Sequence, residues 1–88
     1  MPQAHADPDE IEQFSHQLQG YISELEVMTA SLQQRFQGLS ATWHDQEQQR
    51  FEAEFEQLTQ TMRRFAVAVE PLVPHLQTKA AHLRDYLG

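Results

Sequence analysis

Apolar residues recur at seven-residue spacing through the first half of the chain, and polar residues fill the positions between them. Such spacing, sustained over about four heptads, is typical of an amphipathic helix that packs against another helix. We therefore predict a first helix over about residues 8–37. The apolar positions form two adjacent rows, Ile11, Leu18, Leu25, Leu32 and Leu39 in one, and Phe14, Tyr21, Ile22, Met28 and Phe36 in the other.

The second half of the chain repeats the pattern with two parallel apolar rows. Their width indicates a helix that contacts both its own hairpin partner and a second molecule. We predict this helix over about residues 46–87. The rows are Phe51, Leu58, Phe65 and Leu72 in one, and Phe55, Met62, Val69, Leu76 and Leu83 in the other.

Capping residues mark the expected helix ends. Asp7 is placed to cap the first helix, with Pro8 at its first position. Asp45 precedes the second helix, where Gln48 stands at the position that completes a capping box. We expect Gly38 to end the first helix in the left-handed conformation. The connection between the helices is then a bend over residues 38–45.

Two prolines interrupt the apolar pattern of the second helix. Pro71 and Pro74 each lack the N–H that an unbroken helix requires, so we predict a kink or break at residues 70–74. The same residues also fit a PxxP ligand string. We favour the kink because the apolar rows continue beyond Pro74 on the same side.

The chain's single tryptophan lies in the predicted bend. Trp43 has a large apolar body that needs a cover, and exposed aromatic residues often belong to interfaces. Two roles remain open for it: it closes the end of the hairpin, or it contributes with Asp45 to a recognition surface.

These elements predict an all-α fold, with one domain spanning residues 1–88 as an antiparallel two-helix hairpin. Two antiparallel helices cover only one line of contact, whereas each apolar face is wider than that line. We therefore expect two hairpins to dimerise into a four-helix bundle. The expected hairpin and dimer core consists of Ile11, Phe14, Leu18, Ile22, Leu25, Leu32, Phe36, Leu39, Phe51, Phe55, Leu58, Met62, Phe65, Val69, Leu72, Leu76 and Leu83.

Composition excludes several functions. The 88 residues contain no cysteine, which removes disulfides, thiolate metal sites and a cysteine nucleophile. A net charge of −7 argues against binding to nucleic acid, whose phosphates require clustered basic residues. The sequence has neither the long apolar run of a transmembrane segment nor the features of a signal peptide at its start.

Histidines offer the remaining candidates for chemistry. His44 and Asp45 resemble part of a catalytic arrangement, but no convincing nucleophile accompanies them, so we expect no enzyme activity. His75 and His82 lie seven residues apart and could meet a metal across a twofold axis. Solvated histidines are the simpler interpretation. We predict no cofactor and no metal.

The pattern Leu39-x-x-x-Trp43-x-Asp45, followed by Phe51 and Phe55, resembles the Trp-x-Gly family of helical hairpins. This family is typified by the early secreted antigenic target of mycobacteria and related Esx proteins. The length, the absence of cysteine and the two heptad helices agree with it. The resemblance implies a substrate of a type VII secretion system, made in the cytoplasm and exported folded without a cleavable signal peptide. It also implies a homodimer or a heterodimer with a related hairpin, and a role for Trp43 in recognition.

Two features differ from the family pattern. Asp45 stands where the family has glycine, and Tyr86 lacks the acidic residue four positions later that completes the family's export signal. Either export then depends on a partner's tail, or the chain is a divergent member that is not exported by this route. The partners implied are a secretion ATPase or a larger effector. Two alternatives remain: an intracellular adaptor or chaperone that packs against a helix of a larger effector, and a structural coiled-coil component.

Overall fold

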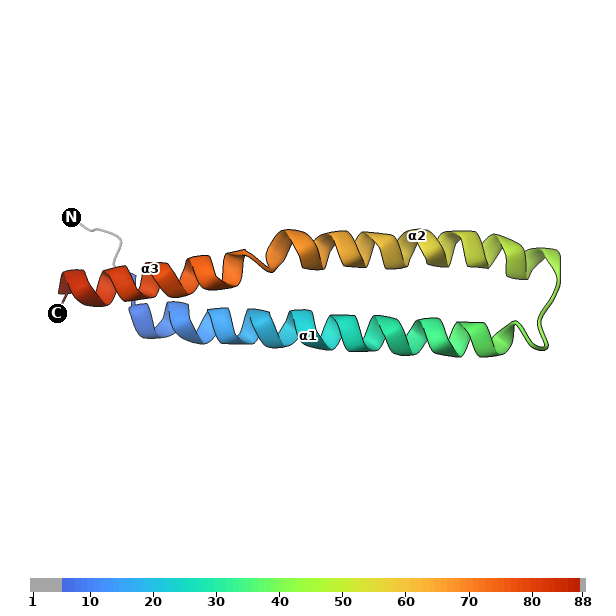
Figure 1. The fold of residues 1–88 in the computed structure, drawn as a ribbon, viewed down its shortest axis with the longest axis horizontal. Helices are drawn as coiled ribbons and strands as arrows, with labels where there is room; N and C mark the ends of the chain where they lie inside the picture. The colour runs from blue at the N-terminus through green and yellow to red at the C-terminus, as the bar shows by residue number, and fades with distance from the viewer. Residues whose placement is uncertain (1–5, 88) are drawn as a thin grey trace.

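The computed structural model describes residues 6–87, which form three helices and, within that range, no strand. Helix α1 spans Pro8–Leu39, α2 spans Gln46–Val69 and α3 spans Leu72–Leu87. Figure 1 shows α2 and α3 following one another along α1 in the opposite direction, with the bend at one end. The rod measures 63 × 22 × 17 Å. The predicted all-α hairpin is confirmed.

Both helix starts have the predicted caps. The side chain of Asp7 accepts a hydrogen bond from the N–H of Asp9 at 2.9 Å, and Pro8 occupies the first helical position. Asp45 accepts a bond of the same length from the N–H of Gln48. The second half of the predicted capping box is wrong, because the Gln48 side chain donates to the Glu52 carboxylate at 3.1 Å instead of reaching back.

The predicted end of the first helix is also wrong. Gly38 lies inside α1, and no described residue has a positive φ. The helix ends one residue later at Leu39, followed by Ser40 with φ −62° and ψ −18°. The N–H of Ser40 donates to the carbonyls of Phe36 and Gln37 at 3.3 and 3.2 Å. The last turn therefore closes with right-handed geometry, for which glycine is not needed.

The two prolines break the second helix as predicted. Helix α2 ends at Val69, Glu70 and Pro71 form a turn, and α3 begins at Leu72. Across the break, the N–H of Val73 donates to the carbonyl of Glu70 at 3.2 Å. Beyond it, α3 packs extensively on α1 and only slightly on α2.

A single chain buries little apolar surface. The buried cluster consists of Ile22, Ala66 and Val73, flanked by the partly buried Leu18 and Val69. No helix within residues 6–87 combines the length and the apolarity needed to cross a membrane. The hairpin thus has a thin seam rather than a broad core.

A further part of the seam is made of small residues. Ser15 of α1 and Ala80 of α3 each have 0% exposure. The hydroxyl of Ser15 donates to the carbonyl of Glu12 at 2.7 Å, so its burial leaves no polar atom without a partner. Small side chains allow two helix backbones to approach closely, and this is the region where α1 and α3 pack together.

Candidate protein-binding site

Nine of the exposed large apolar side chains lie in the heptad rows of the two antiparallel arms of the hairpin. All except Tyr21 and Met28 belong to the predicted core, yet each of the nine is 42–62% exposed in the single chain. We call this set the apolar stripe. Its members are Phe14, Tyr21, Met28, Leu32 and Leu39 in α1, Phe51, Leu58 and Phe65 in α2, and Leu72 in α3.

Contacts between the arms join the central members of the stripe. The rings of Tyr21 and Phe65 meet edge to face, with centroids 6.4 Å apart and an interplanar angle of 84°. Next along the rod, Met28, Leu32 and Leu58 line an apolar groove together with residues of the seam between the helices. Both helices therefore contribute to a continuous face.

The size of the stripe determines what it can do. Burying one Leu or Phe side chain completely contributes roughly 1.5–3 kcal/mol, so burying the exposed half of nine such residues would contribute on the order of 10 kcal/mol before association costs. Exposed apolar surface of this extent is typical of an interaction site.

Other residues of the predicted core lie in the seam between the helices. Ile22 is buried. The remaining nine are partly exposed: Ile11, Leu18, Leu25, Phe36, Phe55, Met62, Val69, Leu76 and Leu83. The heptad rows thus divide into residues that hold the hairpin together and residues that face outward.

An aromatic cluster closes the bend end of the rod. Trp43 is partly buried, and its ring lies 6.1 Å from that of Phe51. Phe36 contacts both Phe51 and Phe55, at 5.6 and 5.2 Å between centroids. The backbone N–H of Trp43 donates to the carbonyl of Leu39 at 2.8 Å. Trp43 therefore covers the end of the hairpin and contacts a member of the apolar stripe, so its two predicted roles are compatible.

The backbone at Asp45 explains how aspartate fits at this position. Its φ of −104° and ψ of −175° are extended values that any residue adopts. Its carboxylate caps α2. Glycine is not required for this bend, and aspartate supplies a hydrogen bond that glycine could not.

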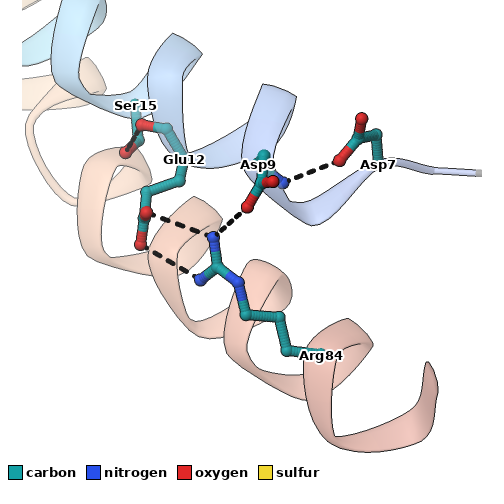
Figure 2. Close-up of polar contacts among 5 residues, drawn as sticks. All are labelled: Asp7, Asp9, Glu12, Ser15 and Arg84. Atoms are coloured by element: carbon teal, nitrogen blue, oxygen red, sulfur yellow. Dashed lines mark hydrogen bonds and ion pairs between the residues drawn. The ribbon is translucent and has the colours of Figure 1, made fainter. Parts of the chain in front are cut away.

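At the opposite end of the rod, Arg84 of α3 bridges two carboxylates of α1 (Figure 2). Its Nη2 lies 2.8 Å from Oδ1 of Asp9 and 3.1 Å from Oε1 of Glu12, and its Nη1 lies 3.2 Å from Oε2 of Glu12. We call these three residues the Arg84 clamp. The sequence pattern does not reveal this clamp, because Arg84 is 72 positions from Glu12 and 75 from Asp9.

The clamp shifts the pKa values of Glu12 and Arg84. The hydrogen bonds and the charge of Arg84 lower the pKa of Glu12 below its ordinary value of 4.5, and the charge of His16 acts in the same direction. Desolvation and the charge of Asp9 oppose this effect. In return, the hydrogen bonds to Glu12 and Asp9 raise the pKa of Arg84. Glu12 and Arg84 are therefore both ionised at neutral pH.

The histidines considered for chemistry are all on the surface. His44, His75 and His82 are exposed, and the carboxylate of Asp45 is engaged with the N–H of Gln48. Within residues 6–87, no three His, Asp or Glu side chains gather as a group that could hold a metal ion.

A family model now places the chain among known proteins. The model of WXG100, described as proteins of 100 residues with WXG, matches residues 3–86. The chain belongs to the WXG100 family. In this WXG100 protein the tripeptide reads Trp43-His44-Asp45, and the geometry of Asp45 shows how the bend forms without the glycine.

Solved structures of a secreted protein, EsxB from Bacillus anthracis strain Sterne, share the fold. Its selenomethionine form is 22% identical with a TM-score of 0.79, and each chain covers 100% of the other. A proline-to-alanine variant is 22% identical with a TM-score of 0.81, over 97% of this chain and 96% of that one. A glutamate-to-glutamine variant is 20% identical with a TM-score of 0.80, over 100% and 98%. No curated protein matches the chain.

Proposed function

We propose that this WXG100 protein is a non-enzymatic, dimeric helical hairpin, exported by a type VII secretion system as a substrate or as the co-exported partner of one. The apolar stripe is the observation that carries the proposal. Family membership and the shared fold with a protein described as secreted support it.

The dimer would form by burying the apolar stripe of one hairpin against that of another. A homodimer with a twofold axis requires a self-complementary surface, and a stripe of mostly Phe and Leu that runs along the rod suits that requirement. A heterodimer with a related hairpin would use the same face. In both cases the seam residues remain the hairpin core, and the stripe residues become the core of a four-helix bundle.

Export would begin in the cytoplasm, with the folded dimer delivered to the secretion ATPase. Trp43 supports this proposal because it is partly exposed beside Phe51 at the bend end of the stripe. We propose that the partner of the dimer carries the signal for export.

Fractionation of the native host tests the proposal. The protein should appear in the culture medium when the type VII ATPase is active and remain in the cell when that ATPase is inactivated, while a cytosolic marker stays in the cell in both strains. Retention in the cytosol while another substrate is exported would contradict export. Retention together with co-purification of a larger chain in fixed stoichiometry would favour an intracellular adaptor.

A further inference from the structure

We infer that α3 is a separate arm, hinged at Glu70 and Pro71, and that the Arg84 clamp holds this arm closed on α1. The inference goes beyond the proposed function, because it concerns the motion of one helix and does not depend on export. It rests on the break between α2 and α3, on the packing of α3, and on the position of the clamp.

The hinge lies where backbone hydrogen bonding is interrupted. Pro71 and Pro74 have no N–H to donate to the preceding turn, and α2 ends before them. Since α3 packs only slightly on α2, its position is set almost entirely by α1. Figure 1 shows the arm lying along α1 beyond the break. A helix connected in this way can move as a unit about a few backbone angles.

Beneath the clamp, the side chains of the arm and of the facing part of α1 that are buried are small. Ala80 and Ser15 are completely buried, and Val73 is 5% exposed. Side chains of this size bury less apolar area than Leu or Phe, so they stabilise the closed position less. Polar contacts at the end of the arm therefore have a larger share in holding it.

The clamp lies where it restrains the arm most effectively. Arg84 is in the last turn of α3, far from the hinge, whereas Asp9 is in the first turn of α1. The guanidinium binds both oxygens of Glu12 as a fork and reaches Asp9 with the same Nη2 (Figure 2). Bidentate geometry of this kind is among the stronger forms of ion pair. One side chain thus closes the open end of the hairpin.

Opening of the arm would change the apolar stripe. Leu72, the first residue of α3, is the stripe's last member, and Val73 packs in the buried cluster with Ile22. Swinging α3 away would uncover Ile22 and displace Leu72. The clamp therefore determines whether Leu72 keeps its place in the apolar stripe.

Hydrogen exchange on the full-length chain tests the inference. In Arg84→Gln, amides of residues 76–87 should exchange about two- to fivefold faster, as expected for loss of a partly exposed ion pair, while those of residues 46–69 stay unchanged. Arg64→Gln is the matched control, because it removes the same charge from an exposed position of α2 that has no ion pair within the described residues. Unchanged exchange in α3, or equal acceleration in α2 and α3, would contradict the inference that α3 opens separately from α2.

A charge reversal separates the ion pair from the packing of the arginine stem. Arg84→Glu should accelerate exchange in α3, and adding Glu12→Arg should restore slow exchange because the pair is rebuilt with opposite polarity. Failure of the double variant to restore slow exchange would contradict the inference that the ion pair holds α3 on α1. In the wild type, raising the salt concentration to about 1 M should accelerate exchange in α3 alone, because the clamp is partly exposed and its charges are then screened.

Discussion

The ring of Tyr21 in α1 meets that of Phe65 in α2 edge to face, yet 54% and 42% of these residues stay exposed to water. The pair therefore has two faces, one that joins the arms of the hairpin and one that extends the apolar stripe. Aromatic pairs in this geometry contribute about 0.5–1.5 kcal/mol beyond their buried area. The contact that aligns the two helices also aligns the surface that a second hairpin would bury.

Trp43 provides a built-in optical probe of the bend, because it is the only tryptophan. Phe51→Ala removes the ring that lies 6.1 Å from it, so we expect its fluorescence to shift to the red as water reaches the indole. Truncation of a fully buried Phe to Ala lowers the unfolding free energy by about 3–5 kcal/mol. Phe51 is half exposed, so we expect a smaller decrease for this variant.

The matched control for that measurement is Phe14→Ala, at the other end of the apolar stripe. It removes a side chain of equal size and similar exposure near the start of α1, whereas Trp43 follows the end of that helix. Emission should remain unchanged. Equal red shifts in both variants would show that the indole responds to loss of the stripe and not to its contact with Phe51.

Replacement of Asp45 tests how α2 begins. Asp45→Ala removes the cap of α2, and we expect a loss of about 0.5–2 kcal/mol in unfolding free energy. Asp45→Gly, which restores the family tripeptide, should lose only a few tenths of a kcal/mol and gain nothing, since the backbone here is extended. Denaturant titration measures both changes. A more stable glycine variant would contradict the assignment of Asp45 as a cap that improves on glycine.

The stability provided by the Arg84 clamp should depend on pH. A carboxyl group whose pKa is lowered by folding stabilises the folded state above its unfolded pKa, and this stabilisation is lost as the pH falls through the folded pKa. For Glu12 the loss therefore begins near its ordinary value of 4.5 and continues below it. We expect Glu12→Gln to be less stable than the wild type at neutral pH, and the difference to vanish at about pH 2.

Urea titration at the two pH values measures that difference. Glu54→Gln serves as the control, because Glu54 is exposed in the middle of α2 and forms no ion pair within the described residues. Its effect should be small at both pH values. A deficit of Glu12→Gln that persists undiminished in acid would mean that Glu12 contributes by packing and not by its charge.

Local chemistry made the helix starts and the break predictable from the sequence. Asp7 and Asp45 cap through bonds that span two or three residues, and Pro71 acts on its own helix, so neighbouring residues decide each outcome. Gly38 shows the limit of such reasoning. Glycine permits a left-handed turn without requiring one, and the chain closes the helix at Ser40 in right-handed geometry.

Tertiary packing decided what the hydrophobic pattern could not. The heptad rows identify apolar positions but do not distinguish Ile22, which is buried in the seam, from Phe14, which faces water. Ser15 is fully buried although it is polar, because two backbones approach there. Arg84 pairs with Asp9 and Glu12, which are 75 and 72 positions away, so only the folded hairpin brings these charges together.

Sedimentation of the purified chain at micromolar concentration tests most directly whether the apolar stripe is a dimer interface. The wild type should sediment with twice the mass of one chain. Phe65→Glu, within the stripe, should sediment as a monomer because dimerisation would bury an unpaired carboxylate. Val67→Glu, two positions away in α2 and 70% exposed outside the stripe, should remain dimeric. A wild type that is a well-folded monomer, or a Val67→Glu variant that dissociates as readily as Phe65→Glu, would contradict the interface.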